Sequence, residues 1–155
     1  MTNKYLQDLS TQYKNKVVIV TGSTQGSGAE VAKLFAHRGA EAITICGRNE
    51  QQGLEIKSEI ESIGSKCIFV KADLNEAEEC QNIVKKTDTA FGKINSLINV
   101  AGFTERGTIL STTLDNYNRN FNIRHDYFPC IPFLLSDNIY DNEKMKNIFY
   151  IRSKM

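Results

Sequence analysis

The sequence predicts an α/β fold, an open and doubly wound parallel sheet that is truncated after its fourth or fifth strand. Short β-branched runs alternate with longer amphipathic stretches from Lys16 onward, which is the pattern of repeated β-α-β units. A glycine-rich turn joins the first run to the first amphipathic stretch. The alternation fades after Gly102, and the 155 residues, 41% of them hydrophobic, suffice for one core of ordinary size.

The first two strand–helix units follow from the spacing of apolar residues. Residues 16–21 form a continuous apolar run that is typical of a strand buried on both faces. Residues 26–38 repeat apolar positions at helical spacing and stop at a glycine. We expect a second strand at 42–46 and a second, more charged helix at 49–63.

The strand–helix pattern then repeats once more, and a fourth strand follows it. We expect a strand at 67–70, a helix that Asn75 caps and that ends at Phe91, and a strand at 94–99. Because crossovers between parallel strands are right-handed, the expected strand order is 3-2-1-4. A further helix is expected to begin near Leu114, and two prolines interrupt its continuation.

Charge and composition limit the possible partners. Nineteen lysines and arginines against eighteen aspartates and glutamates leave a net charge of +1, which argues against nucleic acid or an anionic membrane. No apolar run approaches the ~20 residues of a membrane span, so we expect a cytoplasmic protein. The four cysteines and two histidines lack ligand spacing, so no metal site is expected. The expected partner is a small molecule.

The turn after the first strand is a candidate phosphate-binding loop. Gly22 permits a sharp turn off the strand, Gly26 lets a pyrophosphate approach the main chain, and Gly28 allows the helix to pack closely on the sheet. The start of the following helix offers free N–H donors and a positive dipole. The predicted dinucleotide-binding residues here are Gly22, Ser23, Thr24, Gln25, Gly26, Ser27 and Gly28.

The residues after the second strand predict the cofactor. An acid there would accept hydrogen bonds from a ribose 2′-hydroxyl, whereas an arginine would pair with a 2′-phosphate. Gly47 is followed by Arg48 and Asn49, so the sequence favours NADP(H) over NAD(H). The missing acid also counts against a methyltransferase of similar architecture, because S-adenosylmethionine enzymes generally hold the ribose with an acid at this point.

Two motifs in order carry a family resemblance. The loop has the spacing Gly-x-x-x-Gly-x-Gly, and Asn99-Val100-Ala101-Gly102 follows the fourth strand. Together they resemble the short-chain dehydrogenase/reductase family over roughly residues 14–125. The resemblance implies a Rossmann-type fold and hydride transfer between NAD(P) and a carbonyl or alcohol. Two residues depart from the family pattern, Ser27, where an aliphatic residue is usual, and Val100, where a second asparagine is usual.

The same resemblance implies further site residues. These are Asp73 and Leu74 at the adenine, Asn99, Ala101 and Gly102 beside the cofactor, and Asn122 as the active-site asparagine. Family members also use a serine and a Tyr-x-x-x-Lys pair that lies on one face of a helix.

The C-terminal part of the chain has two interpretations. Tyr150 and Lys154 have the spacing of the catalytic pair, with Ser136 as the upstream serine. Residues 123–149 must then hold the end of a helix, a strand of ~5 residues and two loops of ~4 each, which fits only at minimal lengths. In the second interpretation residues 147–151 are a degraded fifth strand and the spacing of the pair is accidental.

The expected organisation has three parts. Residues 1–13 form an N-terminal extension, residues 14–125 the dinucleotide-binding domain, and residues 126–155 an atypical tail left by truncation or a frameshift. The expected function is an NAD(P)-dependent oxidoreductase with impaired or absent catalysis. The alternatives are a compact, complete enzyme, and a non-catalytic module that binds a nucleotide or pairs through an exposed sheet edge with another chain or a second copy.

Overall fold

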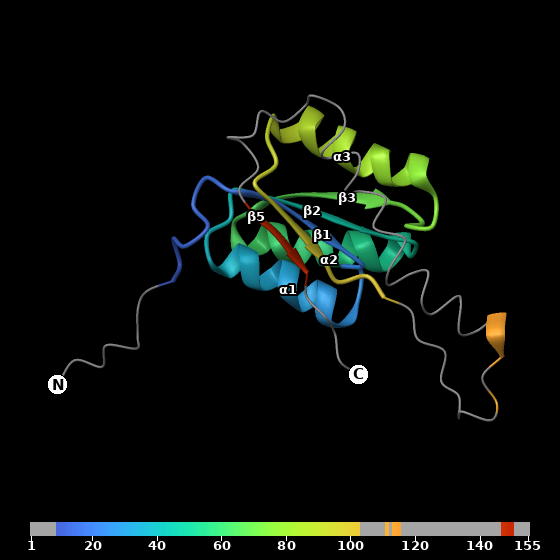
Figure 1. Ribbon diagram of the computed structural model, residues 1–155. Coiled ribbons are helices and arrows are strands. Elements are labelled where there is room, and N and C mark those ends of the chain that lie inside the picture. Colours follow the sequence, from blue (N-terminus) through green and yellow to red (C-terminus); the bar gives the residue numbers. More distant parts are fainter. Residues whose placement is uncertain (1–8, 103–110, 112, 116–146, 151–155) are drawn as a thin grey trace.

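The computed structural model describes residues 9–102, 111, 113–115 and, for the backbone alone, 147–150. Within these residues the chain forms a parallel five-stranded sheet in the order β3-β2-β1-β4-β5 (Figure 1). The strands are β1 (Val17–Thr21), β2 (Ala42–Gly47), β3 (Lys66–Lys71), β4 (Ser96–Asn99) and β5 (Asn147–Tyr150). The predicted order 3-2-1-4 is confirmed, and β5 extends the sheet beyond β4.

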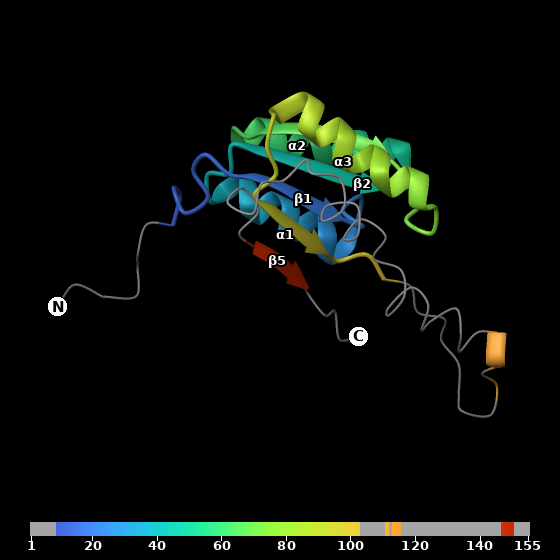
Figure 2. The same cartoon turned by 45° about the horizontal axis from the view of Figure 1, so that its top comes forward.

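Helices cover both faces of the sheet, as a doubly wound fold requires. The helices are α1 (Gly26–His37), α2 (Glu50–Ile63) and α3 (Ala77–Phe91). Figures 1 and 2 show α1 and α2 on one face and α3 on the other. Each face has its own core because strand residues alternate between faces. Val18 and Ile43 pack under α1 and α2, whereas Ile19 and Leu97 pack under α3.

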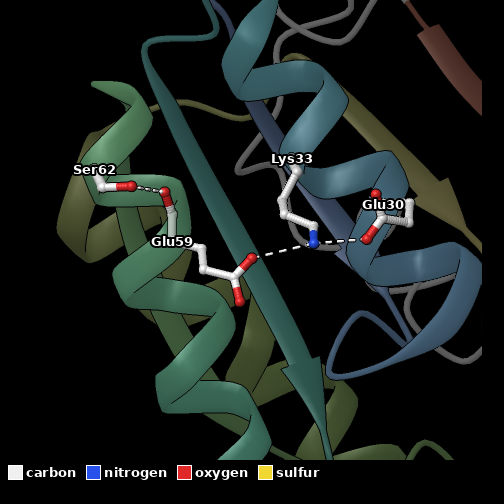
Figure 3. A network of polar contacts seen from close by, with 4 residues as sticks. All are labelled: Glu30, Lys33, Glu59 and Ser62. Carbon is white, nitrogen blue, oxygen red and sulfur yellow. Dashed lines mark hydrogen bonds and ion pairs between the residues drawn. The ribbon is translucent and has the colours of Figure 1, made fainter.

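Polar contacts join α1 to α2 at the surface. Lys33 of α1 lies between Glu30, one turn earlier on its own helix, and Glu59 of α2, at 2.6 Å and 3.1 Å (Figure 3). On α2 the Ser62 hydroxyl donates to the carbonyl oxygen of Glu59 at 2.6 Å. The network is largely solvated, so it adds little to the apolar packing between the two helices.

The segment before β1 packs against the end of α1. The Tyr13 ring meets the Phe35 ring edge to face, with centroids 4.6 Å apart, and the Tyr13 N–H donates to the Arg38 carbonyl. The Arg38 guanidinium donates to the Gln12 side chain at 2.6 Å. Residues 12 and 13, placed by the sequence at the edge of an extension, thus contact the domain at the end of α1 that is remote from its first turn.

Some predicted element boundaries are wrong. The N-cap of α3 is Glu76, because the Asn75 side chain and N–H both donate to the Asp73 carboxylate instead of capping the helix. The fourth strand begins at Ser96 and not at residue 94, since Asn95 turns its side chain to accept from the Val17 N–H. Of the helix expected near Leu114, the structure describes helical backbone at residues 114 and 115.

The sheet bears directly on the two interpretations of the tail. β5 lies parallel to β4, and Tyr150 is paired with Asn99 in the register. Tyr150 is therefore on a strand and not on the helix that a Tyr-x-x-x-Lys pair requires. The fifth-strand interpretation agrees with this sheet, whereas Asn122, Ser136 and Lys154 lie outside the described residues.

Candidate functional site

The glycine-rich loop lies where the strand order of the sheet reverses. β1 connects through α1 to β2 on one side, and its other neighbour in the sheet is β4. Open α/β sheets bind their ligands in the crevice at the carboxyl ends of the strands at such a point. The loop of residues 22–25 leaves β1 at this point and leads directly into α1.

Buried Ser23 holds the loop to the two central strands. Its hydroxyl donates to the Val20 carbonyl at 2.6 Å and accepts from the Cys46 N–H at 3.0 Å. Its own N–H donates to the Cys46 carbonyl at 3.1 Å. Ser23, which the sequence predicts to bind the dinucleotide, therefore uses its hydroxyl within the protein and shapes the loop.

Two glycines of the loop are required by close approaches. A Cβ atom on Gly22 would lie 2.7 Å from the Cα of Ala101, so only glycine lets the loop meet the end of β4. A Cβ atom on Gly28 would lie 2.2 Å from the Gly22 carbonyl oxygen, so only glycine lets α1 start directly against the loop. Gly26 has a φ of +55° and open space in front of it. The loop is thus closed on the sheet side and open at Gly26.

Within the described residues, the first turn of α1 has neither a side-chain cap nor an acidic residue. The N-cap residue is Gln25, whose side chain makes no cap hydrogen bond. By comparison, Asn49 caps α2 by accepting from the Gln52 N–H at 3.1 Å, and the first turns of α2 and α3 contain glutamates. The first turn of α1 therefore combines exposed N–H groups with the positive end of a helix dipole, which suits a pyrophosphate.

The end of β4 closes the other side of the crevice. The buried Thr21 hydroxyl accepts from the N–H groups of Val100 and Ala101, at 3.1 Å and 3.3 Å. Asn99 is 4% exposed, and its Nδ2 has no hydrogen-bond partner in the described part of the chain. An unpaired buried donor costs about 1–3 kcal/mol, so this amide is a natural partner for a polar group at this end of the sheet.

The residues after β2 lie beside the loop. The space in front of Gly47 is filled by the Thr24 side chain, and Arg48 is exposed. Asn49, predicted to face the cofactor, uses its side-chain oxygen to cap α2. Burial raises the pKa of the Cys46 thiol to about 12, so this cysteine beneath the loop is a packing residue and not a nucleophile.

The predicted adenine residues are tied into their own turn. The Asp73 carboxylate accepts from the Asn75 N–H at 3.0 Å and from the Asn75 side chain at 2.7 Å. The Asp73 N–H donates to the Glu79 carboxylate. Leu74 packs against the core beneath α3. The turn follows β3 next to the end of β2, since the Ala72 N–H donates to the Gly47 carbonyl at 3.1 Å.

The structure thus brings most of the predicted residues to one edge of the sheet. The loop contacts the end of β2 through Ser23 and Thr24 and the end of β4 through Gly22. Sequence reasoning missed Thr21, which holds the end of β4, and the contact between Thr24 and Gly47. A threonine at the end of a buried strand was the available signal for the first, whereas the second depends on a distance.

Among the residues that the structure describes, no cluster of three or more histidine, cysteine, aspartate or glutamate side chains is arranged to hold a metal ion. In the same residues, no helix is long and apolar enough to cross a membrane.

Comparisons with known proteins agree with this geometry. The family model for short chain dehydrogenase matches residues 16–126. An uncharacterized oxidoreductase of Thermotoga maritima is 34% identical over 134 residues, which are 86% of this chain and 50% of that protein. An L-fucose dehydrogenase of Bos taurus is 32% identical over 61% of this chain and 33% of its own.

Solved structures give the same result. A dehydrogenase/reductase from Sinorhizobium meliloti superposes with a TM-score of 0.74 at 28% identity, over 81% of this chain and 50% of that chain. An NADH-dependent reductase solved with NAD gives a TM-score of 0.69 at 25% identity, over 79% and 52%. The chain spans about half the length of these structures and half or less of the two curated relatives. The sheet order, the loop and the family model over residues 16–126 together establish that the chain belongs to the short-chain dehydrogenase family.

Proposed function

We propose that the chain is the dinucleotide-binding part of an oxidoreductase of the short-chain type, and that it binds NADP(H) at the loop between β1 and α1. The observation that carries the proposal is the first turn of α1, which has no side-chain cap and no acid and opens at Gly26. A pyrophosphate accepts hydrogen bonds from such N–H groups and is favoured by the helix dipole. The nicotinamide of the bound cofactor would supply the hydride chemistry.

The residues after β2 support NADP(H) over NAD(H). Gly47 brings no carboxylate that would repel a 2′-phosphate. Arg48 is exposed and makes no ion pair among the described residues, so its guanidinium is available for bidentate pairing with that phosphate. Because an NADH-dependent reductase is among the structural relatives, NAD(H) is the competitor that the experiment has to separate.

We also propose that this chain binds its cofactor without turnover. Asn122 is assigned as the active-site asparagine on the family resemblance, and Asp73, Leu74, Ala101 and Gly102 as residues that line the cofactor. In the family the proton-transferring tyrosine lies one helical turn from its lysine, whereas Tyr150 ends strand β5. The expected result is saturable NADPH binding with no carbonyl-dependent oxidation of NADPH.

The test is a titration with NADPH and NADH, followed by cofactor fluorescence, on the wild-type chain and on Gln25→Glu. The substitution keeps the shape of the N-cap residue but adds a negative charge at the proposed pyrophosphate site. The charge favours the helix dipole, so the fold is expected to be retained while both cofactors bind at least tenfold less tightly, about 1.4 kcal/mol.

The matched control is Gln12→Glu. It makes the same change in charge next to Arg38, beyond the far end of α1, and is expected to leave the affinity unchanged. Arg48→Ala is expected to weaken the binding of NADPH about tenfold and that of NADH little, since a charge-assisted hydrogen bond contributes about 1.5–3 kcal/mol. Absence of binding to folded wild-type chain, or equal weakening in both glutamate variants, would refute the proposal.

The composition of the sheet edges favours a second candidate function, a partner-binding module. Among the described strands, β3 and β5 end the sheet on its two sides. β3 has an exposed lysine at each end, which discourages strand pairing, whereas the Asn-Ile-Phe-Tyr sequence of β5 has no charge. A second copy or another chain adding a strand at β5 would give concentration-dependent association, which sedimentation of the chain measures directly.

A further inference from the structure

The last residue of β2 is glycine for a reason of space and not of backbone conformation. Gly47 does not have the positive φ that favours glycine, so its backbone conformation would admit other residues. A Cβ atom at this position would lie 2.7 Å from Cγ2 of Thr24 and 2.8 Å from its Oγ1. Thr24 is itself 8% exposed, and it follows Ser23, whose hydroxyl bonds fix the loop to β1 and β2.

Rotation of the Thr24 side chain does not relieve this contact. A side chain has three staggered positions around its Cα–Cβ bond, and a β-branched side chain fills two of them with heavy atoms. Both filled positions of Thr24 are within 2.8 Å of the Cβ that residue 47 would have. Every other staggered rotamer leaves a heavy atom in at least one of those two positions, so none of them makes room for a side chain at position 47.

Position 47 is the place where an NAD-binding site carries its ribose-binding acid. The acid that accepts hydrogen bonds from the ribose 2′-hydroxyl lies about 20 residues beyond the glycine loop, at the end of the second strand. In this chain that place is Gly47, with Arg48 following it. A carboxylate there would also repel a 2′-phosphate.

We infer that Thr24 is a specificity-determining residue: its branched side chain excludes an acid from position 47 and so keeps the site selective for NADP(H). The inference rests on the proposed function and adds to it a residue that touches the second strand across the loop. Arg48 supplies the attraction for the 2′-phosphate, and Thr24 prevents the competing contact. A change of cofactor therefore requires substitutions at both positions 24 and 47.

The experiment is a set of four variants, Gly47→Asp alone and together with Thr24→Ala, Thr24→Ser or Thr24→Val. Thermal midpoints and the dissociation constants of NADPH and NADH are measured for each. Gly47→Asp alone is expected to lower the midpoint by roughly 5 °C, because it forces a side chain into filled space. Thr24→Ala removes both branches, so the double variant should recover the midpoint and prefer NADH, with a change in the NADH/NADPH affinity ratio of about a hundredfold.

The other two double variants separate shape from chemistry. Thr24→Val exchanges the hydroxyl for a methyl group and so keeps both branch positions filled. The double variant should therefore have the same low thermal midpoint as Gly47→Asp alone. Thr24→Ser has a single heavy atom, which can rotate to the third position, and should recover part of the loss. Recovery by valine as complete as by alanine would overturn the steric argument.

Two further outcomes would overturn the inference in different ways. If Gly47→Asp alone is as stable as wild type and prefers NADH, Thr24 excludes nothing. If wild type binds NADPH and the Thr24→Ala double variant keeps that preference, the inference fails and the proposed function stands. If folded wild type binds neither dinucleotide, the proposed function fails, and selection by Thr24 fails with it.

Discussion

Replacing Ser23 with alanine removes one hydroxyl and breaks two buried hydrogen bonds. The Val20 carbonyl loses a donor at 2.6 Å, and the N–H of Cys46, in a fully buried residue, loses its acceptor at 3.0 Å. A net hydrogen bond contributes about 1 kcal/mol, and a buried donor left unpaired costs about 1–3 kcal/mol. The expected loss is therefore about 3 kcal/mol of unfolding free energy, a large part of the ordinary 5–15 kcal/mol.

Urea unfolding followed by circular dichroism measures this loss, and Ser62→Ala is the matched control. Ser62 donates to a main-chain carbonyl at the same 2.6 Å, but on the exposed side of α2 (Figure 3). We expect the control to change stability by less than about 0.5 kcal/mol, because water replaces the lost partner. If Ser23→Ala and Ser62→Ala differ by less than about 1 kcal/mol, Ser23 does not hold the loop as described.

The ion pairs of two surface lysines, Lys93 and Lys33, give predictions that depend on solution conditions. The hydrogen bond from Lys93, at 2.6 Å, holds the pKa of Glu41 below its ordinary value of 4.5, so the pair stabilises the fold at neutral pH and the contribution is lost as pH falls through the lowered pKa. Glu41→Gln should thus flatten the loss of stability between pH 5 and pH 3 relative to wild type, and parallel curves would contradict the pairing. Lys33→Met should lower the unfolding free energy by less than about 1 kcal/mol in low salt and by nearly nothing in 1 M NaCl, because the ion pairs with Glu30 and Glu59 are solvated. Urea titrations at both salt concentrations measure this difference. An equal loss of stability at both concentrations would point to lost packing.

The order of the sheet could be predicted because β1 and β2 are almost uniformly buried. Residues 17–21 and 42–46 are fully buried, so they read as continuous apolar runs that only a sheet covered on both faces accommodates. The start of α3 could not be placed, since nothing in the sequence tells that Asn75 pairs with Asp73 instead of capping the helix. Local polar side chains have several possible partners, and tertiary packing selects among them.

Some features of the candidate site could likewise be predicted from the sequence, and others could not. The glycines of the loop could be predicted because a strand, a turn and a helix in direct succession require them. The internal role of Ser23 and the contact of Thr24 with Gly47 could not, because both join segments more than twenty residues apart. Asn122 and Lys154 lie outside the described residues, so the role of Asn122 stays a prediction of the family resemblance.

If the proposed cofactor binds at the loop, the bonds of Ser23 also link the supply of that cofactor to the amount of folded protein. The loop is fixed by Val20 and Cys46 inside the sheet, so a ligand on the loop stabilises the same bonds that hold β1 to β2. A cofactor at a hundredfold excess over its Kd adds about 2.7 kcal/mol to the unfolding free energy. That is close to the loss expected for Ser23→Ala, so under the proposed function a cell rich in the cofactor would keep such variants folded and protect them from proteolysis, whereas a cell poor in it would degrade them.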